Sequence, residues 1–207
     1  NANGITALMS AAVDGHDACV QALLRAEANP DLQNADGITA LMSAALKGHD
    51  ACVKELLCAK ATPDVQCTTG GNTVLILATM NGQDACVQLL LRAKASPDLE
   101  NANGITALMS AAVDGHDACV QALLRAEANP DLQNADGITA LMSAALKGHD
   151  ACVKELLCAK ATPDVQCTTG GNTVLILATM NGQDACVQLL LRAKASPDLE
   201  NANGITA

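Results

Sequence analysis

Apolar residues recur along the chain in short groups that fit one face of a helix. In residues 34–66 the groups are Ile38, Leu41 and Met42, and then Val53, Leu56 and Leu57. Spacings of three and four residues within each group are typical of amphipathic helices. Gly48 separates the two groups, so the pattern predicts two short helices joined by a tight break.

The same arrangement returns with a period of about 33 residues, which is the sequence signature of a stacked solenoid. The units are 1–33, 34–66, 67–100, 101–133, 134–166 and 167–200, followed by the stub 201–207. Residues 101–200 repeat residues 1–100 without a change. We therefore expect a single continuous array over 1–207, with one core and no internal domain boundary.

The order of motifs within each unit resembles the ankyrin repeat. The second unit reads Gly-x-Thr-x-Leu from Gly37, Ala-Ala-x-x-Gly-His from Ala44, Val-x-x-Leu-Leu from Val53, and Ala-x-Pro-Asp from Ala61. The resemblance covers every unit. It implies an all-α fold, an ankyrin-repeat solenoid of stacked helix-turn-helix units with short β-turn or hairpin loops.

Two departures from the family pattern concern the helix ends. The family's Thr-Pro-Leu-His reads Thr-Ala-Leu-Met at 39–42, so its threonine to histidine hydrogen bonds cannot form here. The family usually has glycine just after the second helix, whereas this chain has Glu27, Lys60 and Lys94. A left-handed conformation at such residues costs about 1 to 2 kcal/mol, so we expect a local adjustment there.

Local signals set the expected helix boundaries in the first unit at 7–13 and 17–26. Thr6 is suited to cap the first of these helices, because its hydroxyl accepts from an early backbone N–H. Asp17 places a negative charge at the positive end of the second helix, and Arg25 does the reverse at its other end. The third unit has an extra residue at 69–72, which we expect to change the turn without breaking the stacking.

Charge and composition exclude several classes of partner. The formal net charge is -10, and phosphate backbones or anionic membranes repel such a chain. The chain has no Phe, Tyr or Trp, so it lacks a stacking platform for single-stranded nucleic acid. No stretch reaches the roughly 18 apolar residues of a membrane span. We therefore expect neither nucleic-acid binding nor membrane insertion.

Cysteine and histidine have structural explanations in this pattern. Cys19, Cys52 and Cys86 share one position of the second helix, where a small buried apolar side chain is expected. The ten cysteines form no CxxC pair, which argues against zinc. Unpaired cysteines favour a reducing compartment such as the cytoplasm, although the sequence leaves the localisation unknown. Both termini are expected to be incomplete.

His16 and His49 recur without a nucleophile and an orienting acid beside them, so we expect no enzyme activity, metal or cofactor.

Candidate binding residues lie at two places where the resemblance implies partner contacts, the turn tips and the end of each first helix. The tip candidates are Ala2, Asn3, Ala35, Asp36, Thr68 and Thr69. The helix-end candidates are Val13 with Asp14, Leu46 with Lys47, Met80 with Asn81, and the apolar copies Val113, Leu146 and Met180. Stacking would align the apolar members as a stripe, which is either an exposed interaction surface or half-buried packing.

Two functions follow from this pattern. The first is a non-enzymatic protein interaction scaffold that holds a partner against the turn tips and the stripe. The second is a structural role, in which identical triplets build a long rod or filament by end-to-end stacking of copies. The resemblance favours the scaffold, whereas the identity of the triplets favours the filament.

Overall fold

The computed structural model describes residues 3–207, so the tip candidate Ala2 lies outside the described residues. The chain divides into two compact units, Asn1–Ala102 and Asn103–Ala207. Each unit contains one copy of the triplet. The expected continuity of the array over 1–207 concerns how the two units meet, and it stays a prediction.

The described residues of each unit form three helix pairs. The pairs of the first unit are α1 (Ala7–Val13) with α2 (Asp17–Arg25), α3 (Ala40–Lys47) with α4 (Asp50–Cys58), and α5 (Val74–Met80) with α6 (Asp84–Arg92). Those of the second unit are α7 (Ala107–Asp114) with α8 (Asp117–Arg125), α9 (Ala140–Lys147) with α10 (Asp150–Cys158), and α11 (Val174–Met180) with α12 (Asp184–Arg192).

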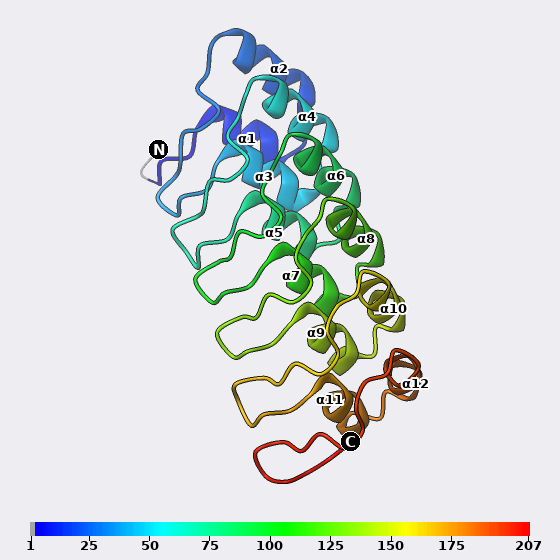
Figure 1. Ribbon diagram of the computed structural model, residues 1–207. Helices are drawn as coiled ribbons and strands as arrows, with labels where there is room; N and C mark the ends of the chain where they lie inside the picture. Colours follow the sequence, from blue (N-terminus) through cyan, green and yellow to red (C-terminus); the bar gives the residue numbers. More distant parts are fainter. Residues whose placement is uncertain (1–2) are drawn as a thin grey trace. The chain divides into compact units, whose positions relative to one another are not determined.

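Within the first unit, α1, α3 and α5 form one row and α2, α4 and α6 form a second row (Figure 1). Long loops project from the first row, and each joins one helix pair to the next. Residues 3–207 contain no β-sheet, and the only strand-like pairings in them are the isolated bridges Gln66 to Thr73 and Gln166 to Thr173. The all-α fold of stacked helix-turn-helix units is thereby confirmed.

Threonine caps begin the helices of the first row. The Thr6 hydroxyl accepts a hydrogen bond from the Met9 N–H at 3.1 Å, and Thr39 caps α3 through Met42 at 3.2 Å. Such a cap satisfies one of the backbone donors that a helix N-terminus leaves without a partner. The first helix begins and ends as expected at 7 and 13, while α2 ends one residue earlier than expected, at Arg25.

Left-handed residues end the helices of the second row. Glu27, Lys60 and Lys94 have φ values of 60°, 63° and 67°, which is the conformation that the family's glycine would adopt there. The chain closes each end with two hydrogen bonds, from Lys60 N–H to Leu57 O and from Ala61 N–H to Leu56 O, both at 3.0 Å. This pair of bonds is the Schellman motif, which satisfies helix carbonyls and offsets the backbone strain.

Small side chains form much of the core between neighbouring repeats. Ala44, Ala45 and Ala78 are 0 % exposed, and α3 packs against both α1 and α5. Met42, which replaces the family's histidine, is also 0 % exposed. Apolar packing therefore occupies the position of the missing threonine to histidine bond.

Glycine is required where a loop crosses its neighbour. Gly37 has φ of 74°, and a Cβ there would lie 2.5 Å from the backbone nitrogen of Thr68 in the next loop. Gly70 has a similar φ of 77°, but a Cβ there would meet nothing within 4 Å. The third repeat thus has two consecutive left-handed glycines, Gly70 and Gly71, which is the expected change of turn.

Gly37 and Gly70 give a matched test of the steric requirement where one loop crosses the next. We expect the double variant Gly37→Ala/Gly137→Ala to lose about 3 kcal/mol or more in free energy of unfolding for each site, because the new methyl groups displace Thr68 and its copy. The control Gly70→Ala/Gly170→Ala carries only the left-handed strain and should lose about 1 to 2 kcal/mol for each site. Urea unfolding followed by circular dichroism measures both, and equal losses would contradict the proposed steric cause.

Candidate interaction surface

Backbone hydrogen bonds join the loop tips into a ladder within each unit. In the first unit the Ala35 N–H donates to Asn3 O at 3.0 Å, Thr68 N–H to Asp36 O at 2.9 Å, and Ala102 N–H to Gly70 O at 3.0 Å. In the second unit Ala135, Thr168 and Ala202 make the equivalent bonds. The ladder fixes the spacing of the tips, and it leaves the side chains of Ala35, Asp36, Thr68 and Thr69 exposed.

The apolar stripe at the ends of the first-row helices is unevenly exposed. Val13 is 36 % exposed, Met80 46 % and Met180 68 %. Leu46, Val113 and Leu146 are half-buried. Some of these apolar side chains are thus exposed and others are half-buried, and their use as an interaction surface stays a prediction.

Charge changes sign along the positions that follow the stripe. Asp14, Lys47 and Asn81 are all exposed, and they are acidic, basic and neutral in turn. The negative net charge of the chain is therefore not concentrated at this edge. A partner meeting the edge would find alternating polar groups beside an apolar centre, which is the usual make-up of a protein interface.

The recurring histidine joins neighbouring repeats. His49 Nε2 lies 3.1 Å from Val13 O of the preceding repeat, and its ring covers Gly15, where a Cβ would lie 2.6 Å from His49 Nδ1. His149 makes the same contacts with Val113 and Gly115. The third repeat has Gln83 in this position, with its amide over Gly48. The structural explanation of the histidine is confirmed at His49.

The aspartates after proline have a role that sequence reasoning missed. Asp31 Oδ1 accepts from the Thr62 N–H at 2.8 Å and Asp31 Oδ2 from the Thr62 hydroxyl at 2.9 Å. Asp64 Oδ1 likewise accepts from the Ser96 N–H at 2.9 Å. The signal available in the sequence was the repeated pairing of aspartate in one unit with Thr or Ser before proline in the next.

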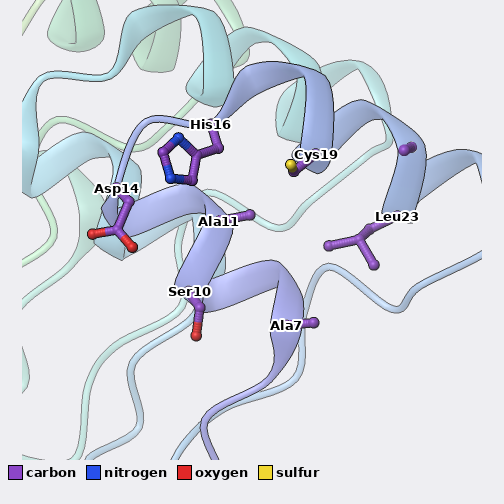
Figure 2. A pocket seen from close by; sticks show the side chains of 8 residues that line it. Ala7, Ser10, Ala11, Asp14, His16, Cys19 and Leu23 are labelled. Atoms are coloured by element: carbon purple, nitrogen blue, oxygen red, sulfur yellow. The ribbon is translucent and has the colours of Figure 1, made fainter.

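A pocket opens between α1 and α2 (Figure 2). Ala7, Ala11, Cys19 and Leu23 converge on it, with His16 and Asp14 toward one end. No side-chain hydrogen bond links His16 to Cys19, Ser10 or Asp14 within residues 3–207.

The residues at the same positions of the second repeat show what kind of surface lines the pocket. In the second repeat, Ala40, Ala44, Cys52 and Leu56 are at most 1 % exposed, where α3 packs on α1 and α4 packs on α2. The pocket between α1 and α2 is thus formed by the residues on which one repeat stacks against another. Its shape needs no small-molecule ligand as an explanation.

Metal-binding clusters and membrane-spanning helices are both absent from residues 3–207. No group of three or more His, Cys, Asp or Glu side chains lies close enough together to hold a metal ion in this part of the chain. None of the helices formed by the same residues is long and apolar enough to cross a membrane.

Comparison with known proteins agrees with the geometry. A family model described as ankyrin repeats in three copies matches residues 1–67, 48–134 and 114–203, and the chain belongs to this family. Among solved structures, the ankyrin repeat domain of human ASB11 is similar, with a TM-score of 0.86 and 28 % sequence identity. The match covers 98 % of this chain and 90 % of that one. No curated protein sequence matches significantly.

Ankyrin repeats generally mediate protein–protein interaction, and the fold is typically a non-enzymatic interaction module. A fold alone does not identify a binding partner. The particular surface used by this chain has to be argued from its own residues.

The cysteines divide into buried and exposed sets. Cys52 and Cys86 are buried as expected, whereas Cys19 is exposed in the pocket between α1 and α2. Burial, reinforced by the nearby carboxylates of Asp50 and Asp84, raises the pKa of the Cys86 thiol to about 11. Burial and neighbouring carboxylates likewise raise the pKa of Cys152 to about 11.

We expect thiol alkylation at pH 8 to separate these sets. Cys58 and Cys158 are exposed at the ends of α4 and α10 and should react readily with iodoacetamide. Cys86 and Cys152 should react at least about 100-fold more slowly, because a pKa near 11 lowers the thiolate fraction. Residues 1–100 and 101–200 yield identical peptides, so peptide mass spectrometry gives each rate in variants whose other copy is replaced by serine, such as Cys186→Ser for Cys86 and Cys52→Ser for Cys152. Denatured protein is the control in which all sites react alike. Equal rates in the folded protein would contradict the assigned burial.

Proposed function

We propose that the chain is a non-enzymatic scaffold that binds a protein segment along the loop tips and the ends of the first-row helices. The observation that carries the proposal is the exposure of the apolar side chains Val13 and Met80 at the ends of α1 and α5, and of Met180 at the end of α11. Exposed apolar surface with polar neighbours tends to mark interaction sites. The general role of ankyrin repeats supports the same assignment.

The partner in this proposal is an extended or helical peptide segment with apolar side chains at its centre. It would meet apolar groups at the stripe and alternating charges at Asp14 and Lys47. The tip ladder supports such binding, because its backbone bonds hold the tip side chains at fixed spacings before a partner arrives. Preorganisation of this kind reduces the entropy lost on binding.

A displayed peptide library selected on the unmodified protein provides the probe. We expect the double variant Leu46→Glu/Leu146→Glu to weaken capture of the selected peptides by at least about tenfold, because it places a charge in the apolar centre of the surface. The matched control is Gln88→Glu/Gln188→Glu, which adds the same charge at exposed positions of α6 and α12. Biolayer interferometry measures binding, and circular dichroism verifies folding. Unchanged binding by the folded Leu46 variant would remove the stripe from the proposal.

The second candidate function is a structural array that grows by stacking of triplets. Two observations favour it. Residues 101–200 repeat residues 1–100 unchanged, and the side chains that line the α1–α2 pocket have counterparts in the second repeat that are buried between repeats. The occupant of the pocket would be the opposite end of the array of a second copy. Contacts of this head-to-tail kind build open filaments when they do not close.

Light scattering over a range of protein concentrations tests this candidate. Self-assembly predicts that mass rises with concentration, and that Cys19→Glu abolishes the rise by placing a charge in the pocket. Ala18→Glu is the control, since Ala18 is exposed on the same helix and does not line the pocket. A constant monomer mass for the unmodified protein would exclude assembly by stacking and leave the scaffold as the function.

A further inference from the structure

Thr62 lies in the linker after α4 and is followed by Pro63. Its side chain is exposed, and so is that of the copy Thr162. A residue before proline is restricted to extended backbone, so the Thr-Pro pair presents its hydroxyl from an extended segment. An exposed hydroxyl in an extended Thr-Pro segment is the substrate form of proline-directed protein kinases.

The Thr62 hydroxyl is also one half of a contact between repeats. It donates to Asp31 Oδ2 at 2.9 Å, while the Thr62 N–H donates to Asp31 Oδ1 at 2.8 Å. In the second unit Thr162 makes both bonds to Asp131 at 2.7 Å. One carboxylate in each unit thus holds the linker of the next repeat through two donors, which we name the Asp31–Thr62 latch and its copy.

We propose that Thr62 and Thr162 are phosphorylation sites of a proline-directed protein kinase, and that phosphorylation opens the Asp31–Thr62 latch. This inference does not depend on the proposed binding face. In the transfer, Thr62 Oγ1 forms a bond to the γ-phosphorus of a nucleoside triphosphate, the bond to the bridging β,γ-oxygen breaks, and the nucleoside diphosphate leaves. The hydroxyl proton passes to a base of the kinase.

The product differs from the hydroxyl in two ways that both act on Asp31. Oγ1 no longer carries a hydrogen to donate, and the phosphate brings a charge of about -1.5 to -2 beside the carboxylate. The negative phosphate and the negative Asp31 carboxylate repel each other. The latch, which is attractive in the unmodified protein, therefore becomes repulsive after modification.

Other repeats supply internal comparisons. The first repeat has Asn29 before proline and cannot be phosphorylated there. The third repeat has Ser96 before proline, but this residue is half-buried and Asp64 accepts from its backbone N–H. Ser96 and its copy Ser196 thus share the hydroxyl-proline pairing with Thr62 and lack its exposure.

The first test treats the folded full chain with a proline-directed kinase and magnesium ATP, and maps phosphate by mass spectrometry. We expect phosphate at Thr62 and Thr162, at least about fivefold more than at Ser96 and Ser196, and none at either threonine position in the Thr62→Val/Thr162→Val variant. An unmodified folded chain, alongside a fully modified denatured chain, would overturn the assignment of these sites. Modification of the serines in preference to the threonines would overturn it equally.

The second test uses a double-mutant cycle to measure the coupling between residues 31 and 62 in the latch. Thr62→Glu/Thr162→Glu places a negative charge beside Asp31 and Asp131, and it should speed hydrogen exchange of the linker amides at 61–64 by at least about tenfold. Thr62→Val/Thr162→Val removes the donor without adding charge and should give a smaller change. In an Asp31→Asn/Asp131→Asn background the glutamate substitutions should have less than half their effect. Equal effects in both backgrounds would show that repulsion by Asp31 is not the cause and would overturn latch opening.

Discussion

Neighbouring helices of the first row lie close together because alanine occupies the positions at which they meet. Ala44 and Ala45 on α3 are completely buried between α1 and α5. A larger side chain there would push the helices apart and separate the loop tips that they carry. Each repeat exposes such a face on both sides, so its stability depends on its neighbours.

Directional contacts then fix how one repeat is placed on the next. Gln33 Nε2 donates to Gly37 O in its own loop at 2.9 Å and lies 3.4 Å from Gln66 O of the following repeat. Gln66 repeats the arrangement with Gly71 O and Glu100 O. Apolar packing alone would tolerate small sliding motions between helices. Hydrogen bonds at the base of the loops, together with His49 at the helix turn, remove that freedom and hold the tips in register.

The sequence predicted those features that depend on nearby residues. Thr6 caps its own helix three residues away, so this cap could be read from one repeat. At Lys60 a local adjustment was expected, and the structure keeps the left-handed conformation there. The Asp31–Thr62 latch could not be read from one repeat, because its partners are 31 residues apart and either side chain alone looks like an ordinary polar residue of a turn. Exposure of the stripe was equally inaccessible, since Leu46 and Met80 occupy one repeat position and differ in exposure through the packing around them.

Differences between repeats leave the stacking core unchanged. Positions at which 34–66 differs from 1–33 are all exposed or half-buried, so substitution has spared the stacking core. Some lie at the tip and the first-row helix end: Asp36, Leu46 and Lys47. The others lie on the second-row helix and linker: Lys54, Glu55, Cys58, Lys60, Thr62 and Val65. Both groups carry charge, at Asp36 and Lys47 in the first and at Lys54, Glu55 and Lys60 in the second. The proposed binding face therefore rests on the exposed apolar side chains Val13 and Met80 at the helix ends, and not on a lower charge than that of the second-row face.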